Sequence, residues 1–461
     1  MKGRNSFYIG GITVVATLGG LLFGYDTAVI SGAEKSIQAY LINGLGLSSL
    51  AHGATISSAL IGCIIGGSLS GIISSAFGRK KALFLAAFLF FVSALGSGYP
   101  EFLFFTKGEP TMGLLFMFNF YRIIGGIGVG LTSAVSPMYI GEIAPADIRG
   151  RLVSINQFAI IFGILVVYFV NWGIANGKPL EWINTIGWRW MFLSEAIPAT
   201  LFGIFLFFVP ETPRYLALNN QDTKALHILT RINGAEQAKV IFRDIKLSVR
   251  KSSAKLFSYG KLIIIIGALL SVFQQFVGIN VAMYYAPRIF ESMGAEKDAS
   301  MFQTVVMGLI NVIFTVIAIM TVDKWGRKPL LMVGSIGMAI GMFAIGALAF
   351  MKIIGISTLV FIIIYTASFM MSWGPICWVL ISELFPNKIR GKAVAVAVAA
   401  QWAANYLISS TYPAMMEFSS GLTYWFYGLM SIISFFFVWK MIPETKGKTL
   451  EEMEHFWKRP S

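Results

Sequence analysis

The chain has 461 residues, of which 56% are hydrophobic and only 13% are charged, and its mean hydropathy is +0.73. A soluble protein cannot bury that much apolar surface, whereas a bilayer accepts it without a hydration cost, so the composition excludes an ordinary soluble protein. The formal net charge of +14 would suggest nucleic-acid binding in a soluble chain, but here we assign the excess lysine and arginine to cytoplasmic loops and expect no nucleic-acid partner.

Long apolar runs recur along the chain, and a membrane-spanning helix needs about 20 such residues. Their number and spacing predict an all-α membrane protein with twelve transmembrane helices. The predicted helices lie at 8–30, 54–76, 82–99, 112–136, 152–172, 189–209, 262–283, 301–322, 330–350, 356–380, 393–412 and 421–442.

Lysine and arginine gather after alternate helices, which predicts that both termini face the cytoplasm. The longest polar stretch, 210–257, is basic and is predicted to be a cytoplasmic linker with short amphipathic helices near 223–232 and 237–249. It would separate an N-terminal six-helix bundle at 1–209 from a C-terminal six-helix bundle at 258–461.

Ionisable residues fall inside predicted spans of the first half. At about 1.5 Å per residue, Asp26 and Arg122 both lie roughly 30 Å from the inner face. A charge at that depth costs about 3 kcal/mol or more unless it is paired. We predict that Asp26 pairs with Arg122 and that protonation of Asp26 releases Arg122 and biases alternating access; a static ion pair is the alternative. Glu195 is a weaker proton-coupling candidate, since packing would explain it equally well.

Neutral amides and tryptophans also lie within the predicted spans, mostly in the second half. Amides both donate and accept hydrogen bonds, as sugar hydroxyls require, and aromatic faces pack against the C–H face of a sugar ring. Each residue alone could instead join two helices by a hydrogen bond worth about 1 kcal/mol or less. As a set they predict a polyol site, and its members are Gln157, Gln274, Gln275, Asn280, Asn311, Trp378, Gln401 and Trp402.

Three motifs of the first half return in the same order in the second half, which indicates an internal repeat. They are Phe-Gly-Arg-Lys at 77–80 and Trp-Gly-Arg-Lys at 325–328, a Glu and Arg pair at Glu142 and Arg149 and at Glu383 and Arg390, and Pro-Glu-Thr at 210–212 and 443–445. Two parallel repeats are the plan of one transporter class, with the substrate bound between the halves near the midplane.

The repeated charges follow helices at the predicted cytoplasmic side. We predict that they form salt bridges across the inner ends that hold the outward-open state and break in the inward-open state. Ordinary anchoring by positive loops is the alternative. The predicted gating residues are Arg79, Glu142, Arg149, Arg327, Glu383 and Arg390.

Glycines four residues apart, as at Gly62 and Gly66 and at Gly126 and Gly130, predict close packing between helices. The glycine-rich run 125–130 follows no predicted strand and lies within an apolar helix, so we do not predict a nucleotide loop.

The motifs resemble those of the sugar porter family of the major facilitator superfamily, over almost the whole chain, and above all its proton-coupled bacterial members that import D-xylose. The matching segments are 78–80, 210–214, 274–280 and 443–447. The resemblance implies two pseudo-symmetric six-helix bundles with the major facilitator fold. It also implies proton-coupled import of D-xylose by a monomer in the inner membrane of a bacterium.

The resemblance also implies roles for single residues. It assigns sugar contacts to Gln157, Gln274, Gln275, Asn280, Trp378 and Gln401. It makes supporting wall or gate residues of Phe23, Tyr284, Asn311 and Trp402.

One position departs from the xylose pattern. Two helical turns after Gln157, the xylose importers carry a second glutamine, whereas this chain has Ile164, as glucose and galactose porters tend to. We expect D-xylose as the first substrate and a hexose as the second candidate. A facilitative hexose uniporter and a non-transporting sugar sensor stay open as alternatives, although Asp26 argues against the uniporter because several facilitative members lack that carboxylate.

We expect no enzyme activity, no cofactor and no metal site. The two cysteines, Cys63 and Cys377, lie inside apolar runs and are predicted to be buried without forming a disulfide. The three histidines, His52, His227 and His455, all fall outside the predicted helix cores, and no nucleophile lies beside a base.

Overall fold

The computed structural model describes residues 6–102, 104–106, 108–145, 148–249, 255–292, 294–353, 355–386, 389–446 and 457. These residues form helices and no strand. Twelve helical stretches among them are long and apolar enough to cross a membrane, which confirms the predicted number of spans. The chain termini and residues 250–254 of the predicted linker lie outside the described residues.

The first half of the chain supplies six of these spans. Its helices are α1 (Ser6–Ile37), α2 (Ser49–Ile56), α3 (Ser58–Phe77), α4 (Arg79–Gly98), α5 (Met112–Ile143), α6 (Arg149–Ala175), α7 (Leu180–Trp182), α8 (Trp188–Ser194) and α9 (Ala196–Leu206). Short π or 3₁₀ turns join some of them, at η1 (Gln38–Ile42), η2 (Asn43–Leu45) and η3 (Ile183–Gly187).

The predicted linker contains three helices and the second half supplies the other six spans. The linker helices are α10 (Pro213–Leu218), α11 (Asp222–Asn233) and α12 (Ala235–Val249), the last two close to the amphipathic helices predicted there. The second half contains α13 (Lys261–Phe276), α14 (Ile279–Tyr284), α15 (Ala286–Ser292), α16 (Lys297–Trp325), α17 (Arg327–Phe350), α18 (Ile356–Met371), α19 (Trp373–Leu384), α20 (Arg390–Phe418) and α21 (Ser420–Met441).

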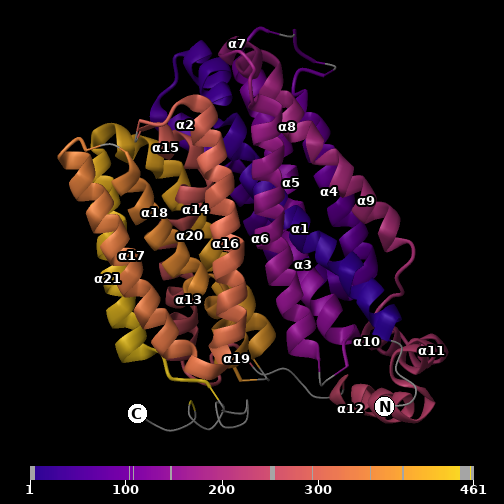
Figure 1. The fold of residues 1–461 in the computed structure, drawn as a ribbon. Helices are drawn as coiled ribbons and strands as arrows, with labels where there is room; N and C mark the ends of the chain where they lie inside the picture. The colour runs from indigo at the N-terminus through magenta and orange to yellow at the C-terminus, as the bar shows by residue number, and fades with distance from the viewer. Residues whose placement is uncertain are drawn as a thin grey trace.

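Figure 1 shows the two halves side by side, with the first half in indigo and magenta and the second in orange and yellow. Between the halves, α6 contacts α16, and α20 contacts α2 and α3. Helices α10, α11 and α12 lie together at one end of the first half (Figure 1). The two halves therefore meet along α6 with α16 and along α20 with α2 and α3.

Small residues allow the closest helix contacts in the first half. A Cβ atom at Gly126 of α5 would lie 1.8 Å from the carbonyl oxygen of Ala59 of α3. A Cβ atom at Gly62 of α3 would likewise lie 2.0 Å from the carbonyl oxygen of Ile123. The glycine spacing thus brings two helix backbones together, as the sequence predicts.

Two spans of the second half that the sequence predicts as continuous helices are broken. The span at 262–283 divides into α13 and α14 at Gly278, whose φ of 91° disfavours any other residue. The span at 356–380 divides into α18 and α19 at Ser372, which has φ −133° and ψ −88°. A break in a transmembrane helix frees backbone polar groups, which is tolerated only where protein or a polar cavity satisfies them.

We predict that Gly126→Ala destabilises the protein by about 1–3 kcal/mol, because the added methyl group overlaps fixed backbone atoms of α3. The matched control is Gly141→Ala in the same helix, where a Cβ atom meets nothing within 4 Å. Thermal unfolding of the purified variants in detergent measures the difference. Equal midpoints for the two variants would contradict the packing described here.

Candidate functional site

A buried ion pair joins α1 and α5. The Arg122 guanidinium donates from Nη1 to Oδ1 of Asp26 at 2.8 Å and from Nη2 to the Asp26 backbone oxygen at 3.1 Å. Their side chains are 1% and 0% exposed. The structure therefore brings together the two residues that the depth argument pairs, and their role in proton coupling stays a prediction.

The neighbours of this pair explain how a charge is held there. A Cβ atom at Gly125 would lie 2.9 Å from Oδ1 of Asp26, so only glycine leaves room for the carboxylate. The Arg122 guanidinium lies over the Phe192 ring at 5.3 Å from its centre. This cation–π contact stabilises the guanidinium where water is excluded.

Glu195 completes the cluster between α8 and α9. Its carboxyl group is fully buried and interacts with both Asp26 and Arg122. The Glu195 carboxyl group lies within hydrogen-bond reach of the Asp26 carboxyl group, and no N–H or O–H group of another described residue donates to either Glu195 oxygen or to Oδ2 of Asp26. Two carboxyl groups beside one guanidinium would leave one uncompensated negative charge, and a single proton between the carboxyl groups would neutralise it.

The predicted amides of the second half form one hydrogen-bonded chain. Gln274 of α13 accepts at Oε1 from Nε2 of Gln401 at 2.6 Å and from Nε2 of Gln275 at 3.2 Å. Gln275 in turn accepts from Nδ2 of Asn280 of α14. The structure therefore brings together four of the six predicted sugar-contact residues, from three helices.

The helix breaks position these hydrogen-bonded amides, and the breaks are not predicted from the sequence. Gln274 donates from Nε2 to the carbonyl oxygen of Trp373 at 2.9 Å, directly after the break at Ser372. Gly278 lies between Gln275 and Asn280, and a Cβ atom there would lie 2.9 Å from the Tyr427 ring. The signal in the sequence is the Gly278 within the 274–280 motif, which the continuous apolar run on either side obscures.

Several polar atoms around the amide chain have no hydrogen-bond partner among the described residues. They are Oε1 of Gln401, Nε1 of Trp402 and both amide atoms of Asn311. An unsatisfied buried polar group costs about 1–3 kcal/mol. A ligand with several hydroxyl groups could satisfy such atoms.

The structure places the remaining predicted residues in different ways. Phe23 of α1 meets Trp402 of α20 at a ring distance of 5.6 Å and so joins the two halves. The Tyr284 hydroxyl accepts from Nδ2 of Asn405 at 3.3 Å. Ile164 of α6 is only 5% exposed. Two predicted sugar contacts are half-buried, Gln157 and Trp378.

The predicted gating charges pair within each half. Arg79 donates to Glu142 at 2.8 Å, and the Thr212 hydroxyl donates to the other Glu142 oxygen at 2.6 Å. In the second half, Arg327 donates to both Glu383 oxygens at 3.0 and 3.2 Å, and the Thr445 hydroxyl donates to Glu383 at 2.6 Å. The two halves thus repeat one cluster.

The other two predicted gating arginines, Arg149 and Arg390, contact backbone carbonyl groups. Arg149 donates to the Ala144 carbonyl oxygen at 3.4 Å, and Arg390 donates to the Phe385 carbonyl oxygen at 3.2 Å. Each arginine therefore contacts the backbone of its own loop. Glu142 and Glu383 contact Arg79 and Arg327, which belong to the same predicted set of gating charges.

A further carboxylate in each half was not among the predicted site residues. Glu211 accepts from the backbone N–H groups of Arg79 and Lys80, the first residues of α4, at 3.1 Å each. Glu444 accepts in the same way from Arg327 and Lys328, at 3.1 and 3.0 Å. A carboxylate at a helix N-terminus satisfies free N–H groups and matches the helix dipole. Burial raises the pKa of Glu211, and these N–H donors oppose that rise.

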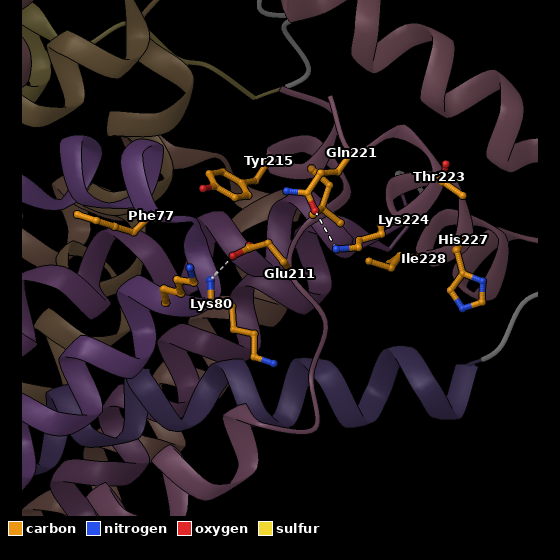
Figure 2. Close-up of a pocket in the computed structure, with 11 residues that line it drawn as sticks. Phe77, Lys80, Glu211, Tyr215, Gln221, Thr223, Lys224, His227 and Ile228 are labelled. Atoms are coloured by element: carbon orange, nitrogen blue, oxygen red, sulfur yellow. Dashed lines mark hydrogen bonds between the residues drawn. The ribbon is translucent and has the colours of Figure 1, made fainter. Parts of the chain in front are cut away.

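A cavity of about 650 Å³ opens beside Glu211, between the end of α3 and helices α10 and α11. Figure 2 shows Lys80 beside Glu211 and Lys224 beside Gln221 in its wall. Its lining contains none of the predicted sugar-contact residues. The cavity is therefore separate from the amide chain.

The chain is similar to known sugar transporters over almost its whole length. The family profile described as "Sugar (and other) transporter" matches residues 12–457. The D-xylose-proton symporter of Escherichia coli (strain K12) is 53% identical over 474 residues, which cover 98% of this chain and 96% of that protein. The glucose facilitated diffusion protein of Zymomonas mobilis is 37% identical, with 97% of each chain covered.

The fold is similar to that of a solved transporter. The inward-open conformation of the xylose transporter from E. coli superposes with a TM-score of 0.89 at 52% identity, covering 97% of this chain and 100% of that chain. The predicted arrangement of two pseudo-symmetric six-helix bundles is thereby confirmed.

Proposed function

This chain belongs to the sugar transporter family, and from that premise we propose that it is a proton-coupled symporter that imports D-xylose by alternating access. It is a multi-pass membrane protein and a transporter rather than an enzyme. The observation that carries the proposal is the buried cluster of Asp26, Arg122 and Glu195, because a facilitator needs no titratable group at that depth.

The proposed proton site is the pair of carboxyl groups beside Arg122. With one proton between Asp26 and Glu195, the cluster is neutral and can stay buried. Loss of that proton leaves a net negative charge that favours a conformation in which water reaches the cluster. Proton binding and release would thereby bias the exchange between outward-open and inward-open states.

The proposed sugar site is the amide chain of Gln274, Gln275, Asn280 and Gln401, with Gln157 facing it from the first half. Trp378 would pack against the C–H face of the sugar ring, and Phe23, Tyr284, Asn311 and Trp402 would complete the wall. The unpaired atoms of Gln401, Asn311 and Trp402 support this assignment.

We propose D-xylose as the first substrate because the E. coli xylose symporter shares 53% identity with this chain, whereas the Zymomonas glucose facilitator shares 37%. Ile164 removes one hydrogen-bonding group from the wall and would admit a hexose. A facilitative hexose uniporter is the second candidate function.

The repeated clusters of Arg79 with Glu142 and Arg327 with Glu383 are the proposed inner gate, with Arg149 and Arg390 beside them. In the outward-open state these ends would meet across the two halves. Neutralising one of them by Glu383→Gln should then favour the inward-open state. Thiol labelling from the cytoplasmic side would measure it, and unchanged labelling would count against the gate.

We also propose how the protein is oriented in the membrane and that it is a monomer. The linker and both termini would face the cytoplasm of a bacterial cell, and residues 1–209 and 258–461 would form the two bundles. Large apolar side chains such as Ile72, Phe116 and Met320 are 68%, 70% and 68% exposed on the spans, which supports direct contact with lipid by a monomer.

We predict that Asp26→Asn abolishes uphill xylose uptake but preserves sugar exchange, because an amide cannot carry the proton. Uptake and counterflow of labelled xylose in proteoliposomes, with and without a pH gradient, measure both activities. The matched control is Glu101→Gln, which removes another buried carboxylate that pairs with an arginine, Arg189, in the same half. Unimpaired accumulation by Asp26→Asn would show that the proton binds elsewhere.

We predict that Ile164→Gln strengthens xylose binding relative to glucose by about 1 kcal/mol, or roughly fivefold, because it restores one hydrogen bond to the sugar. Competition between labelled xylose and unlabelled glucose measures the ratio. Gln157→Ala should weaken both sugars to a similar degree. An unchanged ratio in Ile164→Gln would exclude this position from sugar selection.

A further inference from the structure

A second charged cluster joins the two halves at the end of the molecule away from the linker helices. Figure 1 shows α2 and α15 close together at this end, opposite α10, α11 and α12. The cluster contains Glu34 and Lys35 from α1, His52 from α2, and Arg288 and Glu291 from α15. We call these five residues the outer cluster. None of them belongs to the proton or sugar sites proposed above.

Glu34 is the centre of the outer cluster. Arg288 of the second half approaches its two oxygens with Nη2 at 2.9 Å and Nε at 3.2 Å. His52 approaches Oε1 of the same carboxylate with Nε2 at 3.0 Å. One carboxylate is thus shared between a permanent cation and an imidazole.

The two flanking contacts also cross between the halves. Lys35 forms an ion pair with Glu291, and Arg288 donates to the side chain of Gln38. The Ser300 hydroxyl fixes the other Glu291 oxygen at 3.2 Å. These side chains therefore hold α1 and α15 together by charge.

Close packing excludes water from the centre of the cluster. His52 is 0% exposed and Glu34 is 1% exposed. The His52 ring meets the edge of Tyr285 at 6.3 Å, and Tyr285 packs on Tyr412 at 4.7 Å. Next to His52, a Cβ atom at Gly53 would lie 1.9 Å from the Ser410 carbonyl oxygen. This end of the path is closed in the structure.

We propose that Glu34, His52 and Arg288 form a latch that closes the outer end of the sugar path and that protonation of His52 from the outer medium releases it. The proposal rests on the proposed function and orientation, since it names how that alternating-access cycle responds to the outer pH. The contacts of Glu34 with His52 and Arg288 require α1, α2 and α15 to lie together, so they form only when the outer end is closed.

The charges around His52 determine whether its protonation favours the closed or the open outer end. Nε2 of a neutral His52 lies 3.0 Å from Oε1 of Glu34, and the Glu34 charge is balanced by Arg288. A protonated His52 would bring a second cation to one carboxylate, at a position without water and with no partner for its Nδ1 among the described residues. Burying an uncompensated charge is costly, so protonation favours separation of the halves.

Histidine is the one residue type in the cluster that changes charge in water between pH 5 and 8. His52 lies against Glu34 of α1 and Tyr285 before α15. The charged and titratable groups next to these two are Lys35 on α1, Arg288 and Glu291 on α15, and Tyr412 on α20. An acidic outer medium would therefore hold the path open on the side where both proton and sugar are loaded.

The test uses a cysteine that the latch covers. Ser410 is 7% exposed and lies behind Gly53, so Ser410→Cys, in a chain with Cys63→Ser and Cys377→Ser, should react with an impermeant maleimide only when the outer end opens. Lys178→Cys, at an exposed position, corrects for the pH dependence of the thiol reaction itself. The ratio of the two labelling rates is measured in right-side-out vesicles between pH 5.5 and 7.5.

We expect the ratio to rise about fivefold or more as the pH falls, since titration of one group can change a two-state equilibrium by that factor. His52→Leu and His52→Gln should both remove the pH response, and Glu34→Gln and Arg288→Gln should label fast throughout. Ser49→Ala, which removes an exposed contact with Glu417 between the same halves, is the matched control and should behave like the parent.

A pH response that survives in both His52 variants, or slow labelling of Arg288→Gln, would overturn the latch. Counterflow of labelled xylose in the same vesicles separates this outcome from failure of the transport proposal. Absent counterflow with an intact labelling pattern would overturn xylose transport and leave the latch in place.

Discussion

A charge inside the hydrocarbon core of a membrane has no water to solvate it, and the first half of this protein is built around one such charge at Asp26. Arg122 binds the carboxylate, the Phe192 ring covers the guanidinium, and the missing side chain at Gly125 leaves the space that the carboxylate fills. These features come from α1, α5 and α8. The positions of these three helices relative to one another are therefore tied to the electrostatics of a single side chain.

The polar groups at the centre of the second half are neutral amides, as the proposed sugar site requires. Its spans are broken at Gly278 and Ser372, and the breaks turn amides and a backbone carbonyl group toward each other. The halves share one repeat, yet the breaks at Gly278 and Ser372 flank the amides of the proposed sugar site in one half, while Asp26 and Glu195 lie in the other. Contacts such as that of Phe23 with Trp402 join the two halves, and the proposed coupling between proton and sugar would depend on them.

The number of spans, the pairing of Asp26 with Arg122 and the amide set could be predicted from the sequence, since helix rise and apolar length determine depth. The helix breaks could not, because apolar residues continue through Gly278 and Ser372. Which of the predicted gating charges pairs with Glu142 was also beyond the sequence, and the structure shows that its partner is Arg79, the first residue of α4. His52 was predicted to lie outside a helix core, and the structure instead buries it in the short helix α2, where the partner half covers it.

The Glu211 and Glu444 contacts have a mechanical consequence. Glu211 ties the segment after the sixth span to the first turn of α4, and Glu444 ties the segment after the twelfth span to the first turn of α17. Neither contact joins one half to the other. Neither needs to break when the halves move relative to each other. Each bundle can then turn as a stiff lever about the contacts between α6 and α16 near the middle, and a separation of a few ångströms at one end becomes a closure of similar size at the other.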